Sequence, residues 1–273
     1  MRDVVAELKS LRLHGMASAY EELSGQGGAV IQTSEWLIKH LLDAEVTSRH
    51  ARSISYQMRL ARFPVHRDLN GFDFSHSKVD EKLIKQLATG DFTDAAANVV
   101  FIGGTGTGKT HLATALGVKA ITQHGKRVRF FSTVDLANLL EQEKAAGKQG
   151  RLAYSLMHVD LVILDELGYL PFSQAGGALL FHLLSKLYER TSVVITTNLT
   201  FAEWPSLFGH AKLTTALLDR LTHHCHIVET GNESFRFRQS SQTAKARIKS
   251  REQAKRGKAT QPGMEAAEET EPF

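Results

Sequence analysis

The sequence is short of cysteine and of long apolar runs, and each shortage excludes a class of protein. Cys225 is the only cysteine in 273 residues, which excludes an intrachain disulfide and the small disulfide-stapled secreted folds. No stretch approaches the ~18 consecutive apolar residues of a membrane helix. The first residues also lack the apolar core of a secretory signal. We therefore expect a cytoplasmic protein without a membrane partner.

The composition is that of an ordinary globular chain, with 42% apolar and 23% charged residues, which excludes a wholly disordered protein. The net charge is only +4, but positive charge gathers in two segments. Five arginines and no acid lie between Glu45 and Asp68. Seven basic residues and one acid lie between Lys245 and Lys258. Segments of this kind suit contact with a polyanion.

The hydrophobic pattern divides the chain into a helical N-terminal domain, a connector, an α/β domain and a polar tail, at residues 1–66, 67–97, 98–240 and 241–273. The N-terminal domain, expected to bind DNA or a partner, contains one long helix over 34–62. Phe63-Pro64 ends that helix, because proline disfavours helix in the residue before it. The connector carries a helix near 79–89. The tail has few apolar anchors and is expected to be disordered.

The α/β domain contains five short apolar segments that predict strands, at residues 98–102, 127–131, 161–164, 193–196 and 225–228. Helical stretches separate these segments. Strands that alternate with helices indicate a parallel sheet covered by helices on both faces. The expected fold is therefore an α/β three-layer core with a five-stranded parallel sheet, preceded by the small helical domain.

The strongest motif is a glycine-rich loop between the first strand and the helix that follows. It reads G-x-x-x-x-G-K-T and comprises Gly103, Gly104, Thr105, Gly106, Thr107, Gly108, Lys109 and Thr110. The glycines let backbone N–H groups turn toward phosphate oxygens, and the helix that continues with His111 presents its positive end to the same anion. Lys109 supplies a charge to the β- and γ-phosphates, and the Thr110 hydroxyl is a Mg²⁺ ligand. The loop predicts ATP and Mg²⁺ as cofactors.

A second motif follows the strand at 161–164, which delivers Asp165 and Glu166 at its carboxyl end. Ligands bind at this edge of open α/β sheets. Adjacent side chains alternate along a strand, so the two carboxylates point in different directions. Asp165 can then reach the metal shell, and Glu166 can act as general base on an attacking water. Alone, such a pair also fits a solvated strand end.

Two further polar residues follow the same logic. Asn198 comes after the strand at 193–196, where it would orient the water or contact the γ-phosphate, although asparagine there also suits a simple turn. Arg220 precedes the last strand and would reach a neighbouring subunit's nucleotide. From the residues alone, a local pair with Asp219 explains Arg220 as well.

Taken together, the loop, the Asp-Glu strand, the Asn strand and the late Asp-Arg resemble the P-loop AAA+ ATPase core. The chain is more closely similar to the IstB-type transposition helper ATPases of bacterial insertion sequences, and the resemblance covers about residues 5–240. The segments that carry the resemblance are 8–16, 61–64, 71–74, 164–169 and 217–225. Helicase loaders of the DnaC type share the ATPase half.

The resemblance implies an ATP-dependent DNA-binding helper that multimerises on duplex DNA and recruits or stimulates a transposase. The matched motifs give Lys109, Glu166 and Asn198 catalytic roles, with Arg220 as an arginine finger between subunits. Arg236 resembles the family's second sensor arginine, which contacts the γ-phosphate of its own subunit. A replicative helicase loader is the alternative function.

The arginine-rich helix is the first candidate for contact with DNA. Its residues Arg49, Arg52, Arg59 and Arg62 fall within an arc of ~140° on one face. A one-sided arginine stripe suits phosphate contacts, whereas a merely solvated face would intersperse acids. The second candidate is carried over from related initiators and comprises Lys144, Lys148 and Arg151. Neither set shows base-reading chemistry, so we expect weak sequence preference.

Three other interpretations are weaker. The run His223, His224, Cys225 and His226 invites a metal site, but on a strand at most two of these residues would converge, so no metal is expected there. A small-molecule P-loop kinase would leave the arginine stripe unexplained. A scaffold that binds ATP without hydrolysis would release no phosphate.

Overall fold

The computed structural model describes residues 3–25, 34–169, 173–208 and 211–235. The tail predicted at 241–273 and the sensor candidate Arg236 lie outside these ranges. Within the described ranges, no helix combines the length and the hydropathy that crossing a bilayer requires.

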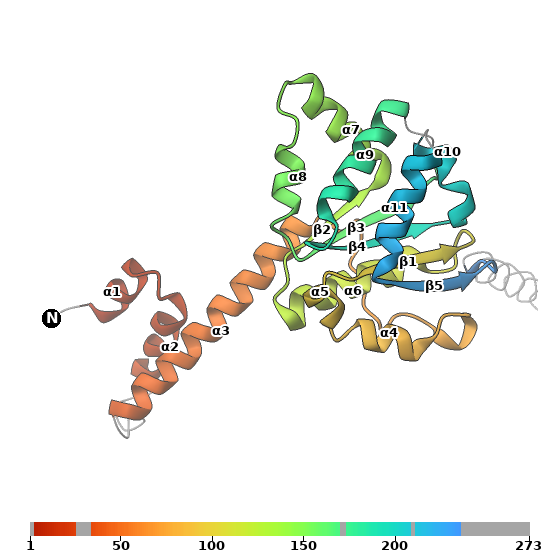
Figure 1. Cartoon of the computed structure of the whole chain (residues 1–273). Helices are drawn as coiled ribbons and strands as arrows, with labels where there is room; N and C mark the ends of the chain where they lie inside the picture. Colours follow the sequence, from red (N-terminus) through yellow and green to blue (C-terminus); the bar gives the residue numbers. More distant parts are fainter. Residues whose placement is uncertain (1–2, 26–33, 170–172, 209–210, 236–273) are drawn as a thin grey trace, which may run out of the picture.

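A parallel sheet of five strands forms the centre of the molecule, with the order β2-β3-β4-β1-β5 (Figure 1). Every neighbouring pair of strands is parallel. The strands in chain order are β1 Asn98–Gly103, β2 Val128–Ser132, β3 Leu161–Leu167, β4 Ser192–Thr197 and β5 Cys225–Gly231. All five predicted strands are confirmed, with ends that differ by up to three residues.

Helices cover both faces of the sheet. Strand side chains alternate between the two cores, so Val99 and Phe101 pack on one face while Val100 packs on the other. The first face is covered by α4 Glu81–Leu87, α5 Asp91–Asp94 and α6 Lys109–His124. The second is covered by α7 Thr133–Ala145, α8 Arg151–Leu156, α9 Gln174–Leu187, α10 Pro205–Phe208 and α11 Ala211–His223. Short 3-10 turns are η2 Phe74–His76 and η3 Phe201–Glu203. The predicted three-layer core is confirmed.

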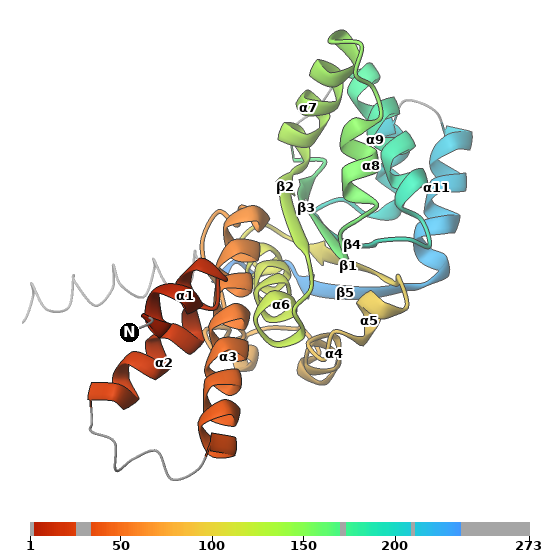
Figure 2. The ribbon, with the colours of Figure 1, turned by 90° about the vertical axis from the view of Figure 1, so that its left-hand side faces the viewer.

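The N-terminal helices are α1 Val4–Ser10, α2 His14–Gly25 and α3 Ser34–Ala61. Helix α2 packs against the first half of α3, and α1 packs on α2, away from the sheet (Figures 1 and 2). The last turns of α3 contact α6 and β2, and Ala61 is fully buried in the first core. The helix ends at Ala61, one residue before the predicted end, because Arg62 adopts φ +58° ahead of Pro64. One helix therefore joins the helical region to the α/β core.

A buried carboxylate holds α2 against α3. Glu45, only 5% exposed, accepts hydrogen bonds from the first-turn N–H groups of Gly15 at 2.8 Å and Met16 at 3.3 Å. Its other oxygen pairs with Arg49 Nε at 2.7 Å and with Arg52 Nη2 at 3.3 Å. The Glu45 carboxylate thus satisfies donors at the start of α2 that the helix itself leaves unpaired.

Candidate functional site

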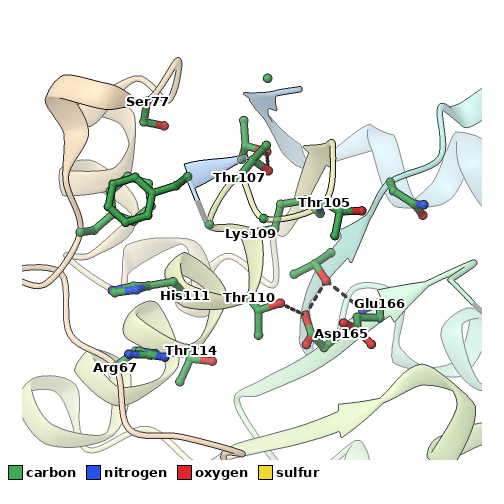
Figure 3. Close-up of a pocket in the computed structure, with 18 of the residues that line it drawn as sticks. Arg67, Ser77, Thr105, Thr107, Lys109, Thr110, His111, Thr114, Asp165 and Glu166 are labelled. Atoms are coloured by element: carbon green, nitrogen blue, oxygen red, sulfur yellow. Dashed lines mark hydrogen bonds between the residues drawn. The ribbon is translucent and has the colours of Figure 1, made fainter. Parts of the chain in front are cut away.

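A cavity of about 930 Å³ opens at the carboxyl edge of the sheet. The glycine-rich loop forms its floor, and the ends of β3, β4 and β5 form one side (Figure 3). The connector around residues 64–78 closes the opposite side. Six of the eight predicted loop residues, 105–110, therefore line one space with Asp165 and Glu166, although they come from different parts of the chain, whereas Gly103 and Gly104 do not line it.

Backbone geometry and close contacts explain the glycines of the loop. Gly106 has φ +77° and Gly108 has φ +95°, a region that glycine enters without steric cost. A Cβ on Gly108 would lie 2.4 Å from a ring carbon of Phe72. The first turn of α6 begins directly after Gly108, so its unpaired N–H groups face the cavity. The loop has the form of an anion-binding site.

Lys109 lies folded over the loop, where its Nζ donates to the carbonyls of Gly103 at 2.8 Å and Gly104 at 2.7 Å. These contacts place the ammonium group at the mouth of the loop, beside the inward-facing amides. A phosphate in the loop would meet both kinds of donor, the point charge and the N–H dipoles. The role of Lys109 toward the β- and γ-phosphates stays a prediction.

The end of β5 supports the loop from behind. Thr107 Oγ1 lies 2.6 Å from Thr230 Oγ1, and Gly104 N donates to Gly231 O at 2.8 Å. Phe235 N donates to Gly106 O at 3.1 Å. The sequence carries no local signal for this support, because β5 lies far along the chain and only the sheet order brings it beside β1.

Asp165 is 7% exposed and stands at the centre of a hydroxyl network. Its Oδ1 accepts from Thr110 Oγ1 at 2.9 Å and from Thr196 Oγ1 at 2.5 Å (Figure 3). Thr133 Oγ1 donates to the Asp165 backbone carbonyl at 2.8 Å. Carboxylate and hydroxyl oxygens are the hard donors that Mg²⁺ prefers, and here they already face each other. The residues present therefore fit the magnesium site predicted at Thr110 and Asp165.

Glu166 has a left-handed backbone, φ +61°, which is uncommon for a residue other than glycine. The pairing of β3 with β4 shifts register between Leu164 and Leu167, so Glu166 sits in an irregular stretch of the strand. Its N–H donates to Thr196 Oγ1 at 2.9 Å, and its side chain is exposed into the cavity. Backbone strain of this kind clusters at functional sites. The alternation of side chains along a strand, predicted from the sequence, and this local distortion together turn the Glu166 carboxylate toward the cavity.

Two more predicted site residues, Asn198 and His111, line the same cavity. Asn198 is exposed one residue after the end of β4. His111 Nε2 lies 2.8 Å from Asp68 O, and its ring packs edge-on against Phe72 with centroids 5.5 Å apart. His111 therefore links the loop helix to the connector.

The connector wall was not predicted to belong to the site. Arg67, Phe72 and Lys78 line the cavity, and Phe72 packs against Phe74 with ring centroids 4.8 Å apart. The available signal was the segment 71–74, which carries part of the family resemblance but suggested no role. An apolar ring next to the phosphate loop offers a surface for the part of a ligand that is not phosphate.

Arg220 does not line this cavity. It lies near the end of α11, and the strand that follows begins with Cys225 paired to Asn98, the first residue of β1. The phosphate loop follows the last residue of β1, so Arg220 lies toward the opposite end of the sheet from the loop of its own chain. Its role between subunits stays a prediction.

The predicted DNA-contacting residues fall into two separate places. Arg49, Arg52 and Arg59 lie on α3, Arg62 follows its last residue, and all four side chains are exposed. Arg49 and Arg52 share Glu45, an acid that in the sequence marks only the boundary of the arginine run. The second set is exposed around the junction of α7 and α8, well away from α3, and comprises Lys144, Lys148 and Arg151 (Figures 1 and 2). Contact with DNA stays a prediction for both sets.

The sequence model of the IstB-like ATP binding protein family matches residues 6–243. The chain belongs to this family. A Geobacillus stearothermophilus protein named as a putative ATP-binding protein of insertion sequence IS5376 is 36% identical over 210 residues, which cover 77% of this chain and 83% of that protein. The Pseudomonas aeruginosa protein named likewise for insertion sequence IS21 is 34% identical over 240 residues, covering 88% and 90%. The predicted family resemblance is confirmed for this IstB-like protein.

Two solved structures are similar to the IstB-like chain. The replication initiator DnaA bound to AMPPCP and single-stranded DNA has a TM-score of 0.50 and 21% identity, covering 62% of this chain and 51% of that one. The DnaC helicase loader has a TM-score of 0.47 and 23% identity, covering 55% and 86%. The likeness to the initiator is one of fold alone, and together with the five-stranded parallel sheet it confirms the predicted α/β fold class.

Proposed function

We propose that this IstB-like protein is a Mg²⁺-dependent ATPase that multimerises on duplex DNA in the cytoplasm and recruits or stimulates a transposase. One observation carries the proposal. Lys109, Thr110, Asp165 and Glu166 converge on a single cavity, in a family described by its binding of ATP. The insertion-sequence names of the relatives support the transposase as partner.

The site residues divide the chemistry among themselves. The amides of the loop and Lys109 bind the triphosphate, and Thr110 and Asp165 would hold a Mg²⁺ ion that neutralises charge on the β- and γ-phosphate oxygens. Glu166 accepts a proton from a water molecule, while Asn198 orients that water in line with the γ-phosphorus. The new bond to phosphorus forms as the bond to the β–γ bridging oxygen breaks, so that ADP and inorganic phosphate are the products.

The proposed assembly completes the site between subunits. Arg220 would enter the cavity of a neighbour and stabilise charge that develops on the γ-phosphate during transfer. The exposed arginines of the α3 stripe and the basic residues between α7 and α8 would contact DNA phosphates, with affinity that falls as salt rises. The two basic sets lie far apart, which suits contact with a long DNA segment by successive subunits.

The first test is phosphate release by the full chain with Mg²⁺ and ATP, in the presence and absence of duplex DNA. We expect the wild type to hydrolyse ATP at a rate that changes when duplex DNA is added. The variant Lys109→Ala should lose both ATP binding and hydrolysis. Lys186→Ala, which removes an exposed lysine on α9, is the control and should keep both properties. If the wild type binds ATP but releases no phosphate, the protein is a non-hydrolysing scaffold and the proposed ATPase activity is wrong.

The second test identifies the partner. The protein, loaded with ATP analogue on duplex DNA, is offered the transposase of its own insertion sequence and, separately, the replicative helicase of the host. Retention of the transposase alone is the expected result. If the protein retains the helicase and prefers single-stranded DNA, the helicase-loader alternative is correct. If ATP consumption requires a small-molecule acceptor, the protein is a kinase.

A further inference from the structure

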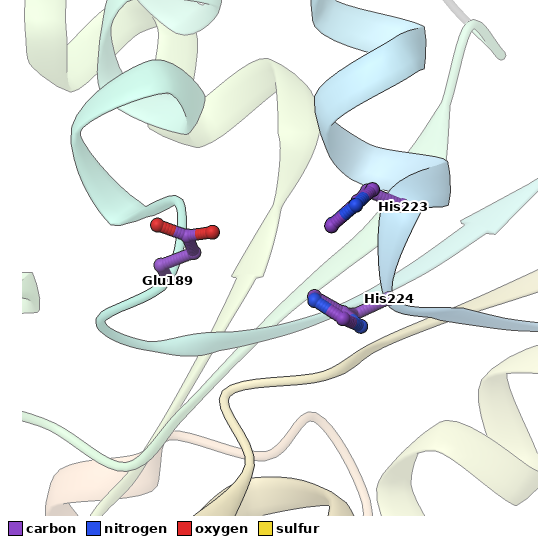
Figure 4. A group of neighbouring side chains, drawn as sticks. All are labelled: Glu189, His223 and His224. Carbon is purple, nitrogen blue, oxygen red and sulfur yellow. The ribbon is translucent and has the colours of Figure 1, made fainter.

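Three side chains with metal-binding atoms converge outside the nucleotide cavity. One ligand atom each from Glu189, His223 and His224 lies within 4.8 Å of the other two, and all three side chains are exposed (Figure 4). Glu189 belongs to the loop between α9 and β4, whereas the histidines lie at the junction of α11 and β5. The cluster therefore joins two segments that are distant in the sequence.

The sequence argued against a metal site at these histidines because it predicted a strand there, and the structure shows that this prediction was wrong for His223 and His224. The expectation treated the four residues at 223–226 as a strand on which neighbours diverge. In the structure α11 continues to His223 and β5 begins only at Cys225, so the two histidines lie at a helix end and a link. Their rings meet edge to face with centroids 4.2 Å apart. Glu189, the third member, has no signal in the sequence that ties it to them.

The backbone on both sides of the cluster is fixed. His224 O accepts a hydrogen bond from Asn98 N at 2.7 Å, which anchors the histidine link to the first residue of β1. On the other side, Thr191 N donates to Leu187 O at 3.0 Å across the Glu189 loop. Glu189 itself has φ +55°, an uncommon conformation for a residue with a Cβ. Only side-chain rotations are therefore needed to draw the three ligand atoms together.

Tyr188 precedes the Glu189 carboxylate in the chain. Burial and the neighbouring Glu189 carboxylate raise the pKa of the half-buried Tyr188. Carboxylates that ligate metals are commonly oriented by hydrogen bonds from neighbouring groups, a role that the Tyr188 hydroxyl would fill. Asp219 and Arg220 lie one turn before His223 on α11, so the cluster borders the proposed arginine finger.

We propose that Glu189, His223 and His224 bind one transition-metal ion of the Zn²⁺ class. Two imidazole nitrogens and one carboxylate oxygen form a donor set that zinc uses, with a fourth position open to water. Mg²⁺ and Ca²⁺ prefer oxygen ligands and fit this set poorly. Ligand atoms around tetrahedral zinc lie about 3.3 Å apart, so small rotations of exposed side chains would complete the geometry.

The binding test uses full-length protein without an affinity tag, titrated with Zn²⁺ in competition with a chromogenic chelator. Wild-type protein should bind one equivalent, and His224→Ala or Glu189→Gln should weaken binding more than about tenfold. Tyr188→Phe, which keeps the ring and removes the hydroxyl, should weaken it to a smaller degree. His50→Ala, an exposed histidine on α3, is the matched control and should not change binding.

Co²⁺ added in place of Zn²⁺ should give the visible absorption of a low-coordinate nitrogen and oxygen site in the wild type and not in His224→Ala. Zn²⁺ should also raise the melting temperature of the wild type and not of that variant, because a ligand that binds only the folded state stabilises it. Equal zinc affinity in wild type and His223→Ala/His224→Ala would overturn the proposal, as would an equal loss with His50→Ala. ATP is not needed for any of these measurements, so the proposal is independent of the proposed ATPase activity.

Discussion

At the scale of single residues, the backbone at Glu166 explains how two adjacent acids serve different purposes. Asp165 points into the buried hydroxyl network, while the left-handed conformation and the register shift turn Glu166 outward into the cavity. Thr196 serves both residues, since its hydroxyl donates to the Asp165 carboxylate and accepts from the Glu166 amide. The geometry thus separates the carboxylate proposed for the metal shell from the proposed base, which faces the cavity.

The first prediction concerns Glu166→Gln, which keeps the shape of the side chain and removes its basicity. ATP affinity should stay within about twofold, and turnover should fall by a factor of about 10² or more, the usual contribution of a general base. Equilibrium binding of a fluorescent ATP analogue and a phosphate-release assay measure the two quantities. Glu81→Gln, an exposed acid on α4, is the control and should behave as wild type; equal turnover in both variants would remove Glu166 from the mechanism.

A second prediction at this scale concerns Gly108→Ala. The added Cβ would collide with Phe72 at 2.4 Å while the backbone stays at φ +95°, so the loop and the connector wall must separate. We expect ATP affinity to fall more than about tenfold, which a loss of about 1.4 kcal/mol of binding free energy already produces. Gly147→Ala also has a positive φ, with open space around it, and should leave ATP affinity unchanged. Equal affinities would mean that the contact with Phe72 does not shape the site.

Residue types and spacing predicted the loop and the acids because their chemistry is local. A phosphate loop needs glycine, lysine and a hydroxyl within eight consecutive positions, and a strand end needs only a short apolar run. Phe72, Thr230 and Glu189 were not predicted, since their roles come from contacts that only the folded chain creates. Glu45 was within reach of the sequence, because it lies four residues before Arg49 on the same helix face.

At the scale of elements, α3 is the member that connects the helical region to the core. Its early part packs against α2, on which α1 packs in turn, and its last turns are buried against α6 and β2. The hydrophobic period predicted the length of this helix within one residue. The period did not reveal that α2 approaches so closely that only glycine fits at position 15, where a Cβ would lie 2.4 Å from Ala44 O.

The third prediction uses this contact. Gly15→Ala should push α2 away from α3 and lower the free energy of unfolding by about 1–3 kcal/mol, the usual effect of overpacking. Gly25→Ala lies in the same helix with nothing within 4 Å and should cause little change. Urea denaturation measures both variants, and hydrogen exchange over residues 14–25 locates the effect. Similar stability of the two variants would contradict the close packing.

The fourth prediction is a pH dependence at Glu45. The hydrogen bond from Arg49, helped by the amides of Met16 and Gly15 and opposed by burial, lowers the pKa of Glu45 below its ordinary value of 4.5. A lowered pKa in the folded state means that the stabilisation is fully present above the ordinary value and is lost as the pH falls through the folded value.

Glu45→Gln isolates this contribution from the other carboxylates. The wild type should have a higher melting temperature than the variant near pH 7, and the difference should shrink as the pH falls below the ordinary value of 4.5 and through the lowered pKa of the folded state. Thermal melts of both proteins across this range measure the difference. A difference that stays constant down to acid pH would mean that Glu45 does not act through its charge.

At the scale of the whole molecule, the sheet separates the two halves of the proposed catalytic site. The triphosphate loop lies at the carboxyl edge, whereas Arg220 lies toward the amino edge of the same chain. A single subunit therefore holds the proposed base and the proposed metal-shell residues together but keeps Arg220, the proposed arginine finger, apart from them. If Arg220 acts in catalysis, it must act on the nucleotide of a neighbour, which makes assembly a condition for turnover.

The most direct measurement of this central claim mixes two inactive variants. Arg220→Ala keeps a complete pocket and lacks the finger, whereas Glu166→Gln keeps the finger and lacks the base. In a head-to-tail ring or filament, each interface joins the pocket of one subunit to Arg220 of the next. Random mixing of equal amounts should therefore give about a quarter of interfaces in which both Glu166 and Arg220 are intact. We predict that phosphate release in the mixture rises well above that of either variant alone. A mixture no more active than the sum of its parts would contradict a site shared between subunits.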